Sequence, residues 1–262
     1  MDNEIKKFLA CLTMDRRIVG VKFLFNEKEY EQSDVKPAKT KLSYCMMVNI
    51  VTSGKSIKVR NEHFWCNSSA RAFGIKEVDE KVKAGIEYFS YGLYNSLGTA
   101  RKVFDEVVYL NHNVYGLELR PIEEFKDEPQ VVIAISKPYN IMRIMQGYSY
   151  EFGFAKNIRF AGNQGVCSEL TTRPYMNNDI NISVLCSNTR HSCNWRDDEI
   201  GVGMPYSIFK KVVNGVLETT NSVEPDYRKD KIIEKAKKEN LDINIKKGEN
   251  YYGSCLGVAR LD

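Results

Sequence analysis

Apolar residues recur along the chain with two periods, one typical of helices and one typical of strands. The i, i+3, i+4, i+7 spacing of apolar side chains near the start predicts an amphipathic helix over residues 3–13. A β-branched and aromatic run predicts a strand over 18–25. The most continuous β-branched run, 130–136, predicts a strand that is covered on both faces.

The same patterns, with turn and capping residues, assign most of the remaining chain. Further helices are expected over 42–51, 67–73, 78–93, 96–107, 141–152, 206–223 and 225–241. Further strands are expected over 56–65, 117–121, 181–186, 243–245 and 254–259. Asn67 or Ser68 is the expected N-cap of the helix over 67–73. The polar segment 27–40 predicts a loop, 157–167 an extended segment interrupted by glycine, and 201–203 a turn.

Helices and strands therefore alternate, which favours an α/β or α+β fold with a mixed sheet and interspersed helices. The 262 residues fit a single domain with a C-terminal helical extension over 206–241. Segments 41–73 and 139–174 share the order helix, strand, cysteine, helix start, with the best match between 55–61 and 156–162. This likeness indicates either an internal duplication or a chance resemblance between two ordinary helix–strand units.

Composition limits the partners. The 38 basic and 34 acidic residues give a formal net charge of +4, so no extended basic field favours nucleic acid. No stretch approaches the roughly 18 apolar residues of a membrane span, and the N-terminus lacks the apolar core of a signal peptide. We therefore expect a cytoplasmic protein with a small-molecule ligand or substrate, neither nucleic acid nor membrane as a partner, and an oligomeric state that the sequence leaves open.

Seven cysteines are the most informative residues for chemistry, and without an export signal we expect them to be reduced. Cys66, Cys167 and Cys186 each stand beside small or polar residues where an extended apolar run stops. A thiol at a strand end faces a cleft more readily than one in the core. Cys11 and Cys45 fit the ordinary interpretation of small buried hydrophobic residues better.

One chemical interpretation is a metal centre. An iron–sulfur cluster needs three or four thiolates, which Cys66, Cys167, Cys186 and Cys193 supply if the fold brings them together. Three histidines limit imidazole sites, although His191 and Cys193 would share a face if they lay in a strand. No local spacing matches a zinc knuckle. The alternative is that these cysteines only line a pocket.

A second interpretation is nucleophilic catalysis by Cys66, Cys167 or Cys186, with the thiol activated by a helix N-terminus, a cation or a histidine. His63 and His191 are the available bases. Charged residues cluster after Cys186, and a solvated polar loop is the ordinary interpretation of such a cluster. The functional alternative is that Arg190 binds a carboxylate or phosphate of the substrate through its planar guanidinium.

The chain resembles a family of uncharacterised prokaryotic proteins, domain of unknown function one-six-nine, found mainly in archaea and anaerobic bacteria. The motifs that carry the resemblance are Val-Gly-Val-Lys-Phe at 19–23, Cys-Asn-Ser-Ser-Ala-Arg-Ala-Phe-Gly at 66–74, Met-Arg-Ile-Met-Gln-Gly at 142–147, Gly-Val-Cys-Ser at 165–168, Asn-Ile-Ser-Val-Leu-Cys-Ser-Asn-Thr-Arg at 181–190 and Asp-Asp-Glu-Ile-Gly-Val-Gly-Met-Pro at 197–205, with Cys45 in a helix. The match spans roughly 18–215. Where the family tends to show Gly-Cys-x-Gly-x-Arg, this chain has Leu-Cys-Ser-Asn-Thr-Arg, so the close backbone approach that those glycines permit is in question here. The resemblance implies a single domain in an anaerobic cytosol and assigns no reaction.

Three functions remain open. The first is a cysteine-dependent protein that holds a metal or iron–sulfur centre for redox or sulfur-handling chemistry on a small metabolite. The second is a metal-free enzyme with a cysteine nucleophile that acts on an anionic metabolite. The third is a binding protein without catalytic activity, whose aromatic pocket, lined also by Arg190, recognises a small anionic molecule.

Overall fold

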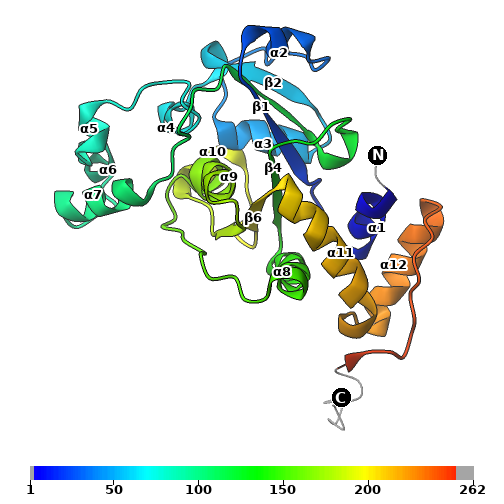
Figure 1. Ribbon diagram of the computed structural model, residues 1–262. Coiled ribbons are helices and arrows are strands. Elements are labelled where there is room, and N and C mark those ends of the chain that lie inside the picture. Colours follow the sequence, from blue (N-terminus) through cyan, green and yellow to red (C-terminus); the bar gives the residue numbers. More distant parts are fainter. Residues whose placement is uncertain (1–2, 252–262) are drawn as a thin grey trace.

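A central sheet organises the molecule. The computed structural model describes residues 3–251, which form one six-stranded sheet in the order β2-β3-β1-β4-β6-β5 with helices on both faces (Figure 1). The strands are β1 (Val19–Leu24), β2 (Ile57–Arg60), β3 (Gly116–Pro121), β4 (Val131–Ser136), β5 (Asn181–Ser183) and β6 (Ile200–Pro205). Within the described part of the chain, all five strand pairings are antiparallel, and the only parallel pairs are two isolated bridges. The mixed α/β class is confirmed.

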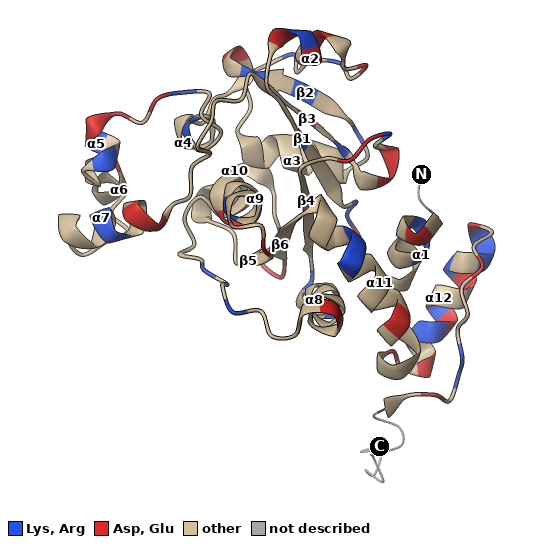
Figure 2. Cartoon of the chain, in the orientation of Figure 1, with Lys and Arg blue, Asp and Glu red and all other residues tan. Residues whose placement is uncertain are grey.

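Helices connect the strands. They are α1 (Asn3–Cys11), α2 (Glu27–Gln32), α3 (Tyr44–Thr52), α4 (Asn67–Ala72), α5 (Glu80–Lys83), α6 (Ile86–Ser90), α7 (Leu97–Glu106), α8 (Pro138–Phe152), α9 (Arg173–Asn177), α10 (Ser187–Cys193), α11 (Tyr206–Val223) and α12 (Asp226–Lys238). Two 3-10 helices, η1 (Asn61–His63) and η2 (Ile122–Glu124), and one π-helix, η3 (Gly165–Thr172), complete the set. Basic and acidic residues both occur along α12 (Figure 2), as its charged sequence suggests.

The sheet separates two hydrophobic cores. Along β4, Val131, Ile133 and Ile135 belong to one core, and Val132 and Ala134 belong to the other. The first core also contains apolar residues of α3 and η3, and the second contains those of α1, α8 and α11. The strand is thus covered on both faces, as its continuous β-branched sequence predicts.

Helices α5, α6 and α7 form a unit that extends away from the sheet (Figure 1). Two hydrogen bonds tie this unit to the residues before η3: Gln164 donates to the hydroxyl of Tyr88, and Asn163 donates to that of Tyr94 over 3.1 Å. We call α5–α7 (Glu80–Glu106) the helical arm. It matters for function because it supplies a wall to two cavities described below.

Two expectations for local structure are wrong because of contacts between distant residues. The glycines at 201–203 form the middle of β6 and not a turn. A Cβ at Gly203 would collide with the backbone carbonyl of Leu170, so the missing side chain lets η3 lie directly on the sheet. That helix is the second difference, because η3 starts inside the segment 157–167 that was expected to be extended.

Smaller differences lie at capping residues and short elements. Cys66 itself is the N-cap of α4, so the expected cap at Asn67 or Ser68 is wrong by one or two positions. The helix expected over 78–93 is two short helices separated at Gly85, whose φ of 77° ends the first one. The segment 27–40 contains α2, and 243–245 forms no strand. The strand expected over 254–259 lies outside the described residues.

The two segments of the suggested duplication differ in structure. Helix α3 packs in the first core and α8 in the second, so they lie on opposite faces of the sheet. The first segment contains β2, while 153–164 contains no strand. The duplication stays a prediction.

Within residues 3–251, no helix combines the length and apolar character needed to cross a bilayer.

Candidate functional site

Four cysteines line one cavity of about 450 Å³ in the first core's side of the sheet. Cys45 comes from α3, Cys66 from the N-cap of α4, Cys167 from η3 and Cys186 from the N-cap of α10. The other lining residues are uncharged, and the helical arm contributes two of them, Tyr91 and Leu93. We call this cavity the thiol pocket. Three of the cysteines predicted from sequence therefore meet, and they are joined by Cys45.

Local sequence explains how the thiols reach the pocket. Ser43 caps α3 by accepting a hydrogen bond from the N–H of Met46 over 3.2 Å, which fixes Cys45 in the first turn. On the opposite wall, Leu185 has a left-handed backbone with a φ of 66°, an unusual conformation for a bulky residue. The turn at Leu185 leads directly into Cys186. Such strain persists only where surrounding contacts enforce it, and it is often found at functional sites.

Cys186 is surrounded by hydrogen-bond donors. The thiol of Cys45 donates to its sulfur, the hydroxyl of Thr189 lies 2.9 Å from it, and the backbone N–H groups of Gly165 and Thr189 also point to it. These donors, the Cys45 thiol first among them, lower the pKa of Cys186 to about 5 against the opposing effect of burial. The surroundings of Cys186 therefore favour its ionised form.

Cys45 is the protonated partner in this arrangement. Its sulfur also lies 3.2 Å from the hydroxyl oxygen of Thr189. Its interactions with the sulfurs of Cys186 and Cys193 favour the protonated form of Cys45 and raise its pKa well above the ordinary range. The same interaction, with a contribution from Ser43 at 3.3 Å, lowers the pKa of Cys193 to about 7. Cys193 is buried behind Cys45 and does not itself line the thiol pocket.

Cys167 and Cys66 lie elsewhere on the pocket wall. Burial raises the pKa of Cys167 well above its usual range, and nearby Cys66 and Cys186 add to that effect. Its Sγ lies 3.7 Å from Oε1 of Gln164, a residue with a left-handed φ of 54° at the start of η3. Cys66 is half-buried. Cys167 itself lies in the π-helix η3, and π-helical segments are rare and frequently found at functional sites.

Arg190 lies outside the thiol pocket. Its guanidinium donates to the backbone carbonyls of Val184 at 2.8 Å, Glu199 at 2.9 Å and Arg196. These three bonds fasten the two ends of the segment around α10. The structure therefore gives Arg190 backbone partners that a substrate anion would have to replace, and its assignment to substrate binding stays a prediction.

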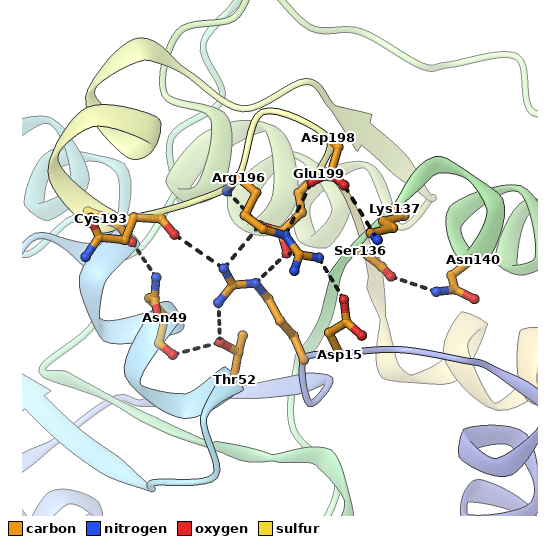
Figure 3. A network of polar contacts seen from close by, with 12 residues as sticks. Asp15, Asn49, Thr52, Ser136, Lys137, Asn140, Cys193, Arg196, Asp198 and Glu199 are labelled. Atoms are coloured by element: carbon orange, nitrogen blue, oxygen red, sulfur yellow. Dashed lines mark hydrogen bonds and ion pairs between the residues drawn. The ribbon is translucent and has the colours of Figure 1, made fainter.

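The charged cluster after α10 forms the network of Figure 3. The buried carboxylate of Glu199 accepts from Arg16 at 2.6 Å and from the backbone N–H of Arg196 at 2.9 Å. Asn49 on α3 donates to the carbonyl of Cys193 in the same network. This network fixes the C-terminal end of α10 against α3, the two helices whose N-terminal ends carry Cys186 and Cys45.

The histidines lie apart from the thiols. His191 is exposed on α10, so the expectation that it shares a strand face with Cys193 is wrong. His63 accepts a hydrogen bond from the N–H of Arg60 over 3.0 Å and does not line the thiol pocket. Within residues 3–251, no group of three or more histidine, cysteine, aspartate or glutamate side chains has an arrangement that could hold a metal ion.

Sequence reasoning missed Cys45 and Gln164. Cys45 follows a good N-cap serine in an apolar helix, a context that is equally typical of a core cysteine. Gln164 gives no local sign of its left-handed backbone. Only the packing of α3 against α10 distinguishes Cys45 from Cys11, which is buried in the second core.

These features define a mixed α/β domain with a cysteine-lined pocket. Residues 7–215 match the family model of domain of unknown function 169, described as Uncharacterised ArCR, and the chain belongs to this family. It is also similar to the "Uncharacterized protein MJ0308" of Methanocaldococcus jannaschii, with 22% identity over 217 residues that cover 80% of this chain and 91% of the relative. No solved structure matches the chain.

Proposed function

We propose that the thiol pocket is the active site of a cysteine-dependent enzyme, with Cys186 as the nucleophile toward a small electrophilic metabolite. The observation that carries this proposal is the set of donors around the Cys186 sulfur, which keeps it ionised at a cavity wall. A thiolate is the reactive form of cysteine, and one with a lowered pKa at an accessible cavity has the properties of known nucleophiles.

The chemical step uses residues on both walls. The Cys186 thiolate supplies the electron pair for a new bond to an electrophilic carbon of the ligand. The bond to the leaving group breaks with its own electron pair, and the leaving group takes up a proton from solvent. The N–H of Gly165, which points to the same sulfur, holds the thiolate in place before attack.

Site-resolved alkylation with iodoacetamide tests this proposal. We expect Cys186 to react faster than the other cysteines, with a rate that rises with pH through a midpoint near 5. Cys186→Ser should abolish the fast phase, and Cys11→Ser, in the opposite core, should leave it unchanged. Equal labelling rates at all accessible cysteines, or a fast phase that survives in Cys186→Ser, would exclude Cys186 as the nucleophile.

A second candidate function is a metal or iron–sulfur centre for redox or sulfur-handling chemistry. The observation that favours it is that four thiols from separate elements line one cavity without any carboxylate or imidazole, a donor set that selects soft metals. Since these side chains have no ligating arrangement in the described residues, binding would require them to move closer together.

Anaerobic reconstitution with iron and sulfide distinguishes the two functions. A stoichiometric cluster with its charge-transfer absorption, lost in both Cys66→Ser and Cys167→Ser, would favour the metal centre. A colourless protein with no bound iron, together with selective alkylation of Cys186, would favour the nucleophile. Cys11→Ser is again the matched control, because Cys11 lies in the opposite core.

A further inference from the structure

A second cavity, of about 590 Å³, adjoins the thiol pocket. It lies between α7 of the helical arm and the segment 158–173. Asn163 lines both cavities and is held to the arm through Tyr94. The two cavities thus share Asn163 as a lining residue and are neighbours.

The charge of the second cavity differs from that of the first. The thiol pocket has no charged lining residue, whereas Lys102, Arg159 and Arg173 all line the second cavity. Of its two acidic residues, Glu169 is buried and already accepts from the N–H of Ala161 at 2.6 Å and from the hydroxyl of Ser183. The basic side chains therefore dominate the surface that a ligand would meet.

Arg173 has unmet hydrogen-bonding capacity. Its side chain is 9% exposed, and its Nε is buried without a hydrogen-bond partner among the described residues. One terminal nitrogen donates to the carbonyl of Glu106, and the carboxylate of Glu106 is 4.0 Å from the guanidinium. A buried guanidinium with an unpaired donor is costly, and a carboxylate or phosphate pairs with such a group once the side chain turns toward the cavity.

Glu106 shows that a carboxylate fits between the two arginines. Its Oε2 lies 2.8 Å from Nη1 of Arg159 and 4.0 Å from Nη2 of Arg173. The Glu106 side chain is 60% exposed, so it can turn away to solvent and leave this position to a ligand anion.

We propose that this second cavity is an anion subsite, which binds the carboxylate or phosphate end of a metabolite whose electrophilic end reaches Cys186. The inference rests on the proposed function for the position of the reactive end, and on Arg159, Arg173 and Lys102 for the anionic end. It assigns anion recognition to this cavity, which shares Asn163 with the thiol pocket, in place of the segment that contains Arg190.

Homologous ω-bromoalkanoic acids and their amides test the substrate class. Without a subsite, the Cys186 thiolate repels an acid, so the acid should alkylate Cys186 more slowly than the matched amide. With the subsite, we expect one chain length at which the acid reacts about tenfold faster, with a saturating rate. An acid that is no faster than its amide at any chain length overturns the proposal.

Exposed residues provide variants that keep the fold. Arg159→Gln and Lys102→Gln should reduce the ratio of the acid rate to the amide rate several-fold. Glu106→Gln removes the competing carboxylate and should increase the preference. Arg101→Gln is the matched control, because Arg101 is exposed on the same helix, pairs with Asp105 and does not line the cavity.

A binding experiment separates this inference from the proposed nucleophile. Inorganic phosphate, titrated into Cys186→Ser and followed by phosphorus NMR, should bind saturably and should lose binding when Arg159→Gln is added. Phosphate binding without selective alkylation of Cys186 would contradict the nucleophile and support the subsite. Selective alkylation of Cys186 by the amide, with no phosphate binding and no preference for the acid, would contradict the subsite alone.

Discussion

Cys45 and Cys186 share the hydroxyl of Thr189, which lies 3.2 Å from the first sulfur and 2.9 Å from the second, although the two cysteines are far apart in the chain. The interaction between the two thiols lowers the pKa of Cys186 and raises that of Cys45. A protonated thiol beside a thiolate is one arrangement that favours a low cysteine pKa. The reactivity of the pocket therefore depends on how α3 packs against α10.

Replacing Cys45 tests this dependence directly. Cys45→Ala removes the donor that contributes most to the low pKa of Cys186, so the midpoint of its alkylation should rise by about one to two pH units. Cys45→Ser keeps a donor and should restore much of the shift. Alkylation rates measured by mass spectrometry between pH 4 and 9 provide the midpoint, and Cys11→Ala is the control. An unchanged midpoint in Cys45→Ala would show that the backbone N–H groups suffice.

Stability should also depend on pH through Cys186. Its pKa is lower in the folded chain, about 5, than the value of about 8.5 for a free thiol. Ionised Cys186 therefore stabilises the fold fully above about pH 8.5, and this contribution is lost as the pH falls through 5.

The comparison of wild type with Cys186→Ser by urea denaturation measures this contribution. The difference in unfolding free energy should rise with pH between 5 and 8, by at most about 1.4 kcal/mol per unit. Cys11→Ser should give a flat difference below pH 8, because burial raises the pKa of Cys11. A flat difference for Cys186→Ser would mean that this thiol is protonated in the folded state.

The sequence correctly predicted the helices and strands whose apolar residues follow one regular period along consecutive positions. The β-branched run of β4 and the apolar period of α11 predict their own structure, since each carries its burial pattern in consecutive residues. Cys66, Cys167 and Cys186 could be selected because each follows an apolar run. The sequence could not place Cys45, because its role depends on a contact with α10 that no local pattern encodes.

The same limit explains the errors at η3 and β6. Gly201 and Gly203 indicate a turn when they are considered alone, yet both lie against Leu170 of the π-helix. Neither element is predictable without the other: the helix needs a strand without side chains there, and the strand needs a covering element. Arg173 was missed for a related reason, since its burial follows from the packing of η3 and α9 under the helical arm.

The network of Figure 3 should be a large contributor to stability. The Glu199 side chain is 1% exposed, so Glu199→Ala leaves the Nε of Arg16 and the backbone N–H of Arg196 without their acceptor. We expect a loss of about 3–5 kcal/mol in the free energy of unfolding. Asp105→Ala, which breaks an exposed pair with Arg101, should cost less than about 0.5 kcal/mol. Similar losses for the two variants would contradict a structural role for Glu199.

The contact between Gly203 and Leu170 should affect both the stability of the fold and the reactivity of Cys186. In Gly203→Ala, the new methyl group collides with the Leu170 carbonyl, so η3 must move away from β6. Overpacking of this kind costs about 1–3 kcal/mol. Because the N–H of Gly165, at the start of η3, points to Cys186, the displacement should also raise the midpoint of Cys186 alkylation.

Gly98→Ala is the control for this variant. Gly98 lies in α7 with no close neighbour, and alanine there should stabilise the helix by about 0.5–1 kcal/mol. A Gly203→Ala variant that loses stability but keeps its alkylation midpoint would show that the thiolate does not depend on the position of the π-helix.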